Sequence, residues 1–338
     1  SSAASDVYKR QYYNSVGYTN QDGVMKGTNY QRYTLQSKQD FKKGIFQAGT
    51  NVVLTYDQSN PLYSVIRGGM VGHTLQAIPT WEQYDENRTG GYGGLYGDVV
   101  NLTHPLGMVD DNLMKRYSDN VKIFANAYVS VELMKGLKYK LNLTPDFQFY
   151  RYNSYEGLFD FGLAKHDITA VTEQQTRTRN ILVENLLTFD RTFGDHKVSA
   201  LVGYTYQDSR YRYMQGSGQG MPTGITEIDA ASQGLAVSGN SSRSVLTSIL
   251  GRAFYSYKNR YLLTATIRRD GSSKFGSNYR YGNFPSVSVG WNIAEEDFVK
   301  NSVSWLDQLK LRGGYGVLGN QEIDNYQYVS VVTTGINY

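Results

Sequence analysis

The sequence predicts an all-β protein: an antiparallel, up-and-down transmembrane β-barrel, in part, with about 11 or 12 strands. Three observations carry this prediction. Apolar residues recur at every second position over long runs, and the connections between the runs alternate between short and long. Tyrosine is abundant, with 30 in 338 residues, and it gathers near the ends of the runs. No stretch contains 18 consecutive apolar residues, so no membrane-spanning helix is expected.

The alternating runs define the strands. They cover residues 121–133, 137–150, 198–207, 261–270 and 284–293. Strict alternation over more than about eight residues favours a strand, because successive side chains of a strand point to opposite faces. The apolar sets carry almost no charge, whereas the opposing sets carry Lys, Glu, Asp and Arg. We therefore expect one face to meet lipid and the other a hydrated interior.

The connections indicate two different ends. Short ones are expected near 39–43, 134–136, 193–196 and 258–259, with a helical turn in the somewhat longer 295–306. Long ones are expected at 58–118, 151–168, 215–240 and 271–281, with smaller loops at 20–28 and 319–325. Tight turns at one end and long loops at the other are typical of outer-membrane barrels, where the turns are periplasmic. Tyr255, Tyr257, Tyr261, Tyr211 and Tyr213 lie near strand ends and favour aromatic girdles at the two interfaces.

Composition excludes several classes of protein. The absence of cysteine excludes a disulfide scaffold, a thiol nucleophile and an iron–sulfur site. A net charge of +4, spread along the chain, is too small for a nucleic-acid-binding stripe. The four histidines, at 73, 104, 166 and 196, lack zinc-site spacing and are expected to be solvated loop residues.

No enzyme or cofactor site is expected either. Asp85–Glu86, Asp110–Asp111 and Glu295–Glu296 are adjacent carboxylates, which usually point apart rather than flank one bond. Gly314–Gly319 matches G-x-G-x-x-G, but no helix is expected after it, so a nucleotide site is not predicted.

The long loop 58–118 holds the first candidate binding residues. It carries Trp81, Tyr84, Asp85, Glu86, Tyr92, Tyr96 and Asp98, with glycines at 90, 91, 93, 94 and 97. Aromatic rings stack on sugar faces, carboxylates accept hydrogen bonds from hydroxyls, and glycine permits close approach of a ligand. The same residues also suit contact with a partner lid or packing within the loop, and the sequence leaves these alternatives open.

A second candidate lies on a predicted strand. Arg268 and Asp270 are two residues apart, so they share a face and are expected to pair in the interior wall. The pair suits a contact to substrate or to a plug domain, and it equally suits a structural ion pair beside the Asp-Gly-Ser turn.

Several segments resemble one family. YLLTATIRRDGSSKFGSNYRYGNFPSVSVGWNIAEEDF at 261–298 and LDQLKLRGGYGVLGNQEI at 306–323 resemble the signature of SusC/RagA-type TonB-dependent outer-membrane transporters. YYNSVGYTNQDGVMKGTNYQRY at 12–33 is similar to the first barrel strands of that family. His-Pro-Leu-Gly at 104–107 stands where the family usually has Asn-Pro-Leu-Ala. The resemblance covers nearly all of 12–338.

The resemblance implies a location, a function and partners. It implies import of oligosaccharides or peptides across the outer membrane of a Gram-negative bacterium, with a SusD-like surface lipoprotein as lid. The inner-membrane TonB complex would act on a plug domain, powered by the proton-motive force, and no cofactor is implied. A structural or adhesive barrel, a passive pore and an outer-membrane enzyme are the alternatives.

The resemblance also bears on the limits of the domain. Residues 12–338 are expected to form part of the barrel, with the plug and further C-terminal strands outside it. Residues 1–11 break the pattern and resemble read-through of a sequencing adapter, although an ordinary frayed terminus fits as well.

Overall fold

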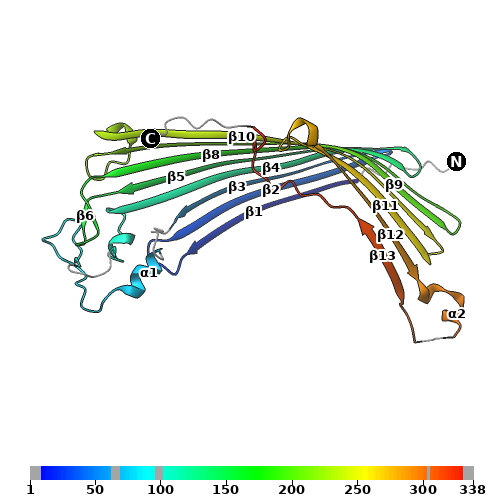
Figure 1. The fold of residues 1–338 in the computed structure, drawn as a ribbon, viewed down its shortest axis with the longest axis horizontal. Helices are drawn as coiled ribbons and strands as arrows, with labels where there is room; N and C mark the ends of the chain where they lie inside the picture. Colours follow the sequence, from blue (N-terminus) through cyan, green and yellow to red (C-terminus); the bar gives the residue numbers. More distant parts are fainter. Residues whose placement is uncertain (1–8, 62–68, 96–101, 303–304, 330–338) are drawn as a thin grey trace.

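The computed structural model describes residues 9–61, 69–95, 102–302 and 305–329 (Figure 1). Eleven strands form one antiparallel sheet, and its order follows the chain from β1 to β13, omitting only β6 and β7. These strands are β1 (Lys9–Asp22), β2 (Asn29–Lys43), β3 (Phe46–Asn60), β4 (Met114–Met134), β5 (Leu137–Glu156), β8 (Ala170–Phe193), β9 (His196–Gln219), β10 (Gln233–Tyr257), β11 (Tyr261–Ser272), β12 (Tyr281–Asn292) and β13 (Lys310–Gly316). The prediction of an up-and-down sheet of about 11 strands is confirmed.

Smaller elements occupy the connections. β6 (Phe159–Asp160) and β7 (Lys165–His166) form a separate hairpin, and α1 (Gly69–Gln76) lies between β3 and β4. α2 (Asp297–Lys300) confirms the helical turn predicted after β12. Within the described ranges, no helix is long and apolar enough to cross a membrane.

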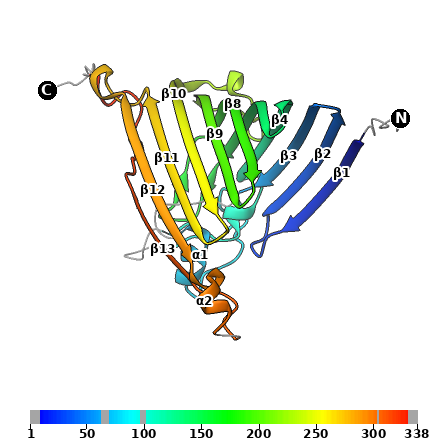
Figure 2. The ribbon, with the colours of Figure 1, turned by 90° about the vertical axis from the view of Figure 1, so that its right-hand side faces the viewer.

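The sheet is curved and open, with β1 and β13 at its two edges (Figure 2). Consecutive strands pair almost without register shifts, so directly paired residues share one face. The apolar face defined by Val129 continues through Ala48 on β3 and Leu141 on β5. On the later strands, Val202 and Ile249 belong to this apolar face, and each is 58% exposed. An exposed apolar surface of this breadth indicates contact with lipid.

Strands at the long-loop end extend further than predicted. β8 and β9 have 24 residues each, and β10 has 25. A tilted strand needs only about 9–11 residues to cross a bilayer, so these strands project beyond it. Residues 151–156, 215–219 and 233–240, predicted as loop, are therefore strand. At the other end, residues 39–43 were predicted as a turn, but they are the last residues of β2. The turn itself is at Gly44–Ile45.

The main hydrophobic core lies in the loops rather than the sheet. Met70, Met108, Leu113, Phe159 and Phe161 form one buried cluster between α1, the β3–β4 loop and the β6–β7 hairpin. These elements lie together at the left end of Figure 1, opposite α2. The β3–β4 loop (described residues 69–95 and 102–113) and the β5–β8 loop (157–169) therefore pack together at one end of the sheet. We call these residues the loop cap.

The short-turn end has its own polar clamp. Arg260 pairs with Glu296 at 3.2 Å and with Asp297 at 2.5 Å, and the Tyr261 hydroxyl donates to Glu296 at 2.7 Å. The Trp291 indole donates to the same carboxylate at 3.0 Å. These bonds fix α2 against the ends of β11 and β12.

Only part of the N-terminal segment 1–11 is described by the structure. Residues 1–8 lie outside the described residues, and 9–11 open β1, paired with 40–42 of β2. Whether 1–11 is foreign to the protein stays a prediction.

Candidate ligand-binding sites

The loop cap brings together three of the predicted aromatic residues. Trp81 and Tyr92 pack on His104, with ring centroids 4.8 and 5.2 Å away, and Tyr92 also meets Phe161 edge-on at 6.1 Å. Tyr84 lies 5.6 Å from Tyr92 at the surface and is 66% exposed. Most of these rings therefore pack against each other in tilted or edge-on contacts, and Tyr84 is the most exposed of the five.

His104 is the centre of the cluster. Its Nδ1 accepts the backbone N–H of Leu106 at 3.2 Å, and its Nε2 lies 3.3 Å from the Glu82 carbonyl, to which it donates in the matching tautomer. Burial lowers the pKa of His104. A bond from a side-chain acceptor to the N–H two residues on is the one that Asn makes in an Asx-turn. His104 thus makes the bond of an Asx-turn with an imidazole nitrogen in place of an amide oxygen.

Three carboxylates of the cap, those of Asp85, Asp160 and Asp110, are also engaged within the protein. Arg88 joins Asp85 at 3.0 Å to Asp160 at 3.4 Å, a link from the β3–β4 loop to the β6–β7 hairpin. The Tyr92 hydroxyl donates to Asp110 at 2.8 Å. Burial, reinforced by this hydrogen bond, raises the pKa of Tyr92 to about 12.

The glycines of the cap make close backbone approaches. A Cβ on Gly93 would collide with the Glu82 carbonyl, and one on Gly162, whose φ is +91°, would collide with the Leu95 carbonyl. Close approach therefore occurs between protein segments at these two positions. Tyr96, a predicted binding residue, and Asp98 of the same loop lie outside the described residues.

Arg268 and Asp270 lie apart from the cap, on the polar face of β11. The Arg268 Nε is 2.7 and 2.9 Å from the two oxygens of Asp270, and an Nη donates to Ser248 at 3.1 Å. The predicted pairing within the wall is confirmed. Both residues line a cavity of about 280 Å³ shared with Tyr279, Arg280, Phe284 and Gln321. We call this cavity the β11 pocket.

Two histidines differ from expectation. His73 and His104 are buried, each 4% exposed, so the prediction of solvated loop histidines is wrong for these two. His73 accepts the backbone N–H of Thr103 at 2.9 Å, and burial lowers its pKa. Among the residues that the structure places, no group of three potential metal ligands occurs.

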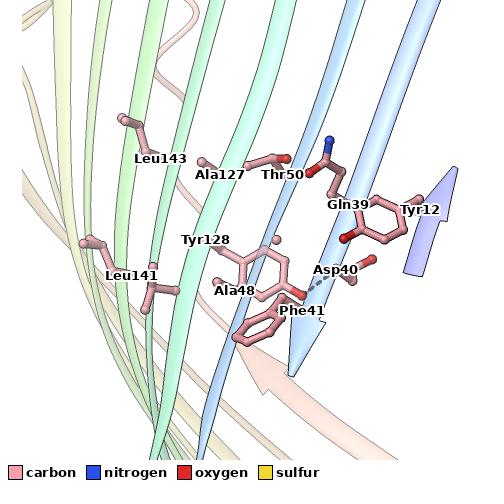
Figure 3. A pocket seen from close by; sticks show the side chains of 12 residues that line it. Tyr12, Gln39, Asp40, Phe41, Ala48, Thr50, Ala127, Tyr128, Leu141 and Leu143 are labelled. Atoms are coloured by element: carbon pink, nitrogen blue, oxygen red, sulfur yellow. Dashed lines mark hydrogen bonds between the residues drawn. The ribbon is translucent and has the colours of Figure 1, made fainter. Parts of the chain in front are cut away.

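The sequence did not predict a groove on the apolar face between β1 and β5, shown in Figure 3. It has a volume of about 410 Å³, and Ala48, Thr50 and Ala127 lie along it between Phe41 and Leu141. Small side chains flanked by larger ones on paired strands produce the hollow. Beside the groove, Tyr128 donates to Asp40 at 2.7 Å. Its apolar lining suits a lipid chain better than a polar substrate.

An antiparallel sheet with an exposed apolar face, tight turns at one end and a loop cap at the other defines the wall of an outer-membrane β-barrel. No model of a known protein family matches the chain. The TonB-dependent receptor P39 of Formosa agariphila is 29% identical over 335 residues, 98% of this chain and 31% of that receptor. The TonB-dependent receptor SusC of Bacteroides thetaiotaomicron is 27% identical over 353 residues, 96% of this chain and 34% of that receptor.

A solved structure agrees on the fold. The RagAB peptide transporter superposes with a TM-score of 0.83 at 20% identity, over 97% of this chain and 37% of that one. The matches confirm the predicted resemblance: the chain is SusC/RagA-like, with the barrel-wall fold of a TonB-dependent receptor of the Gram-negative outer membrane. The chain spans about a third of the length of the curated relatives it matches.

Proposed function

We propose that the chain forms part of the barrel of an importer that takes up oligosaccharides, or peptides, by a TonB-dependent mechanism. The observation that carries the proposal is the likeness to TonB-dependent receptors over nearly the whole chain. The similar proteins include the receptor SusC and, among solved structures, a peptide transporter. We therefore propose oligosaccharides or peptides as the class of substrate and name no particular molecule.

The proposed mechanism is binding and gating without covalent chemistry, so the protein is not proposed as an enzyme. The β11 pocket is lined by two cations, Arg268 and Arg280, and by the carboxylate of Asp270. The Arg268 side chain is 45% exposed. Sites that enclose a drug-sized ligand usually measure about 300–1,000 Å³. The β11 pocket lies just below that range, so it would hold one polar unit of a longer ligand.

The proposed partners act at opposite ends of the barrel. A SusD-like lipoprotein would cover the loop cap, where Val71, Leu75 and Tyr84 are 50%, 81% and 66% exposed. Val71 and Leu75 are four residues apart on α1 and share one face of the helix. The TonB complex would act on a plug domain from the periplasmic side.

Uptake by cells tests the proposal. A strain that carries the receptor at full length and a matched deletion strain receive fluorescently labelled oligosaccharide or peptide libraries. We expect accumulation that requires the receptor and that stops when TonB is deleted or a protonophore is added. Accumulation that persists without TonB indicates a passive pore, and surface binding without accumulation indicates an adhesive barrel. Cleaved products that appear outside the cell would indicate an enzyme.

A further inference from the structure

The apolar face of β8, β9 and β10 ends in arginine. Reading toward the long loops, the outward positions change from Ile181 to Arg179 on β8 and from Val245 to Arg243 on β10. On β9 they change from Tyr206 through Asp208 to Arg210. Arg179, Arg210 and Arg243 are directly paired across the three strands. We call these three residues the arginine row.

This arrangement is electrostatically unusual. Like charges placed directly opposite each other in a sheet destabilise it. Asp208 is the shared counter-ion, 8% exposed at its side chain, with Arg243 at 3.0 Å and Arg179 and Arg210 at 3.3 Å. One carboxylate against three guanidinium groups leaves the row positively charged.

Neighbouring charges increase this excess. Arg177 and Arg212 form the next outward pair above the row, and both are exposed. Besides Asp208, β8, β9 and β10 carry one outward acid, Glu173, four residues above Arg177. Asp119, on β4, pairs with Arg151 of β5 at 2.8 Å. The patch therefore attracts an anion.

Donors remain for that anion. Each guanidinium has five N–H groups in a fork that matches a phosphate. No more than two groups of each arginine in the row reach Asp208. The side chains of the row are 36–47% exposed, so an outside ligand has access to them.

The height of the row identifies the environment. Tyr255 lies ten positions after Val245, and both side chains point outward on β10. At about 3.3 Å per residue and a tilt of about 40°, this stretch is about 25 Å tall. Because the short turns are periplasmic, the arginine row lies at the outer-leaflet headgroups.

We propose that the arginine row binds a phosphate group of an anionic lipid in the outer leaflet. The fork of Arg210 and Arg243 clasps the phosphate oxygens, and Asp208 holds both guanidinium groups in place from below. The acyl chains of the lipid then lie along the apolar stretch around Val245 and Tyr206. This site faces away from the interior, so it is independent of the imported substrate and of the proposed import function.

The test uses the receptor at full length in nanodiscs and three probes: lipid A, phosphatidylcholine and inorganic phosphate. Native mass spectrometry or a fluorescent lipid A reports binding. We expect the variant R210Q/R243Q to bind lipid A at least tenfold more weakly than the parent. The matched control is R252Q, on the same strand β10 but on the polar face, and it should retain binding within twofold.

Several outcomes would overturn the proposal. Equal lipid A binding by R210Q/R243Q and the parent would show that the row is only an ion cluster around Asp208. Phosphatidylcholine has a phosphate but no net charge. If it bound as tightly as lipid A, selection of an anionic lipid by the arginine row would be excluded. Binding of inorganic phosphate as tight as that of lipid A would identify a free anion as the ligand. If the double variant does not fold, R243Q replaces it, with an expected loss of at least threefold.

Discussion

The loop cap and the β11 pocket contain the same kinds of residues and differ in what those residues contact. In the cap, Asp85 is paired with Arg88, and Tyr92 is bonded to Asp110. In the β11 pocket, Arg268 is paired with Asp270, yet both still face an open cavity. Residue chemistry suited to a ligand therefore marks a binding site only where some of it remains accessible.

The difference has an energetic basis. A buried polar group must be paired, since leaving it unpaired costs about 1–3 kcal/mol. A ligand entering the cap at Tyr92 or His104 would first have to replace existing bonds. In the β11 pocket the Arg268 side chain is 45% exposed, so a ligand can reach it while its bond to Asp270 stays in place. We expect the cap to act mainly as a rigid frame and the pocket as a place of contact.

The largest expected effect comes from opening the cap at its centre. Phe161 is 0% exposed and stacks on Phe159 at 4.5 Å. We expect Phe161→Ala to lower the free energy of cap opening by about 3–5 kcal/mol, because a large buried ring is replaced by a cavity. Hydrogen exchange of the cap amides measures this. The matched control is Tyr84→Ala, whose ring is largely exposed, and equal protection loss in both variants would contradict a packed cap.

The next effect separates binding from folding at the β11 pocket. We expect Arg268→Gln to weaken substrate binding by about 10- to 100-fold, because bonds to a charged group contribute about 1.5–3 kcal/mol. The control Arg269→Gln alters the adjacent residue, which points to the opposite face of β11 and lies 5.0 Å over the Tyr281 ring. Titration calorimetry on the full-length receptor checks both. Similar affinities for the two variants would exclude the pocket as a contact site.

A smaller effect concerns pH. Burial holds the pKa of His104 below its ordinary value of 6.5. The unfolded cap therefore takes up a proton at higher pH than the folded cap does. Stability of the cap is complete above pH 6.5 and declines as the pH falls toward the lowered pKa. We expect faster amide exchange in the cap at pH 5.5 than at pH 7.5, after correction for the intrinsic rate.

A matched variant isolates this histidine. His104→Asn retains a side-chain acceptor for the Leu106 N–H but does not titrate. The variant should show a smaller pH effect, with the remainder due to His73, whose pKa burial also lowers. An unchanged pH dependence in the variant would assign the effect elsewhere.

Much of the sheet was predictable because its signal is local. Alternation between neighbours identifies a strand and its two faces without knowledge of partners, and it placed Arg268 and Asp270 on one face. Strand ends were harder, since stretches such as 215–219 and 233–240 contain Gly and Ser, which are typical of loops. In these stretches, hydrogen bonding to a neighbouring strand continues the β-strand beyond the residues that alternate in hydrophobicity. The arginine row had a local signal that was missed: continuing the alternation of 198–206 reaches Asp208 and Arg210.

The cap was less predictable because its contacts join distant segments. Arg88 meets Asp160 across 72 residues, and His104 meets Phe161, which lies 57 positions further along the chain. No period in the sequence encodes such pairs, so the choice between ligand contact and self-packing stayed open. The two buried histidines were mispredicted for the same reason: histidines in a polar loop are usually solvated, and only the packed cap buries them.

The smallest expected effect tests the outer surface of the cap, where the frame and a partner would meet. Leu75→Ser removes the most exposed apolar side chain of α1, at 81% exposure. Because the Leu75 side chain buries little surface when no partner is bound, we expect the free energy of unfolding to change by no more than about 0.5 kcal/mol. Affinity for a SusD-like lipoprotein should fall by about three- to tenfold if α1 lies in the interface. The control Ile45→Ser is an exposed apolar site at a short turn, and co-purification yield should distinguish the two. Equal yields would place the lipoprotein away from α1.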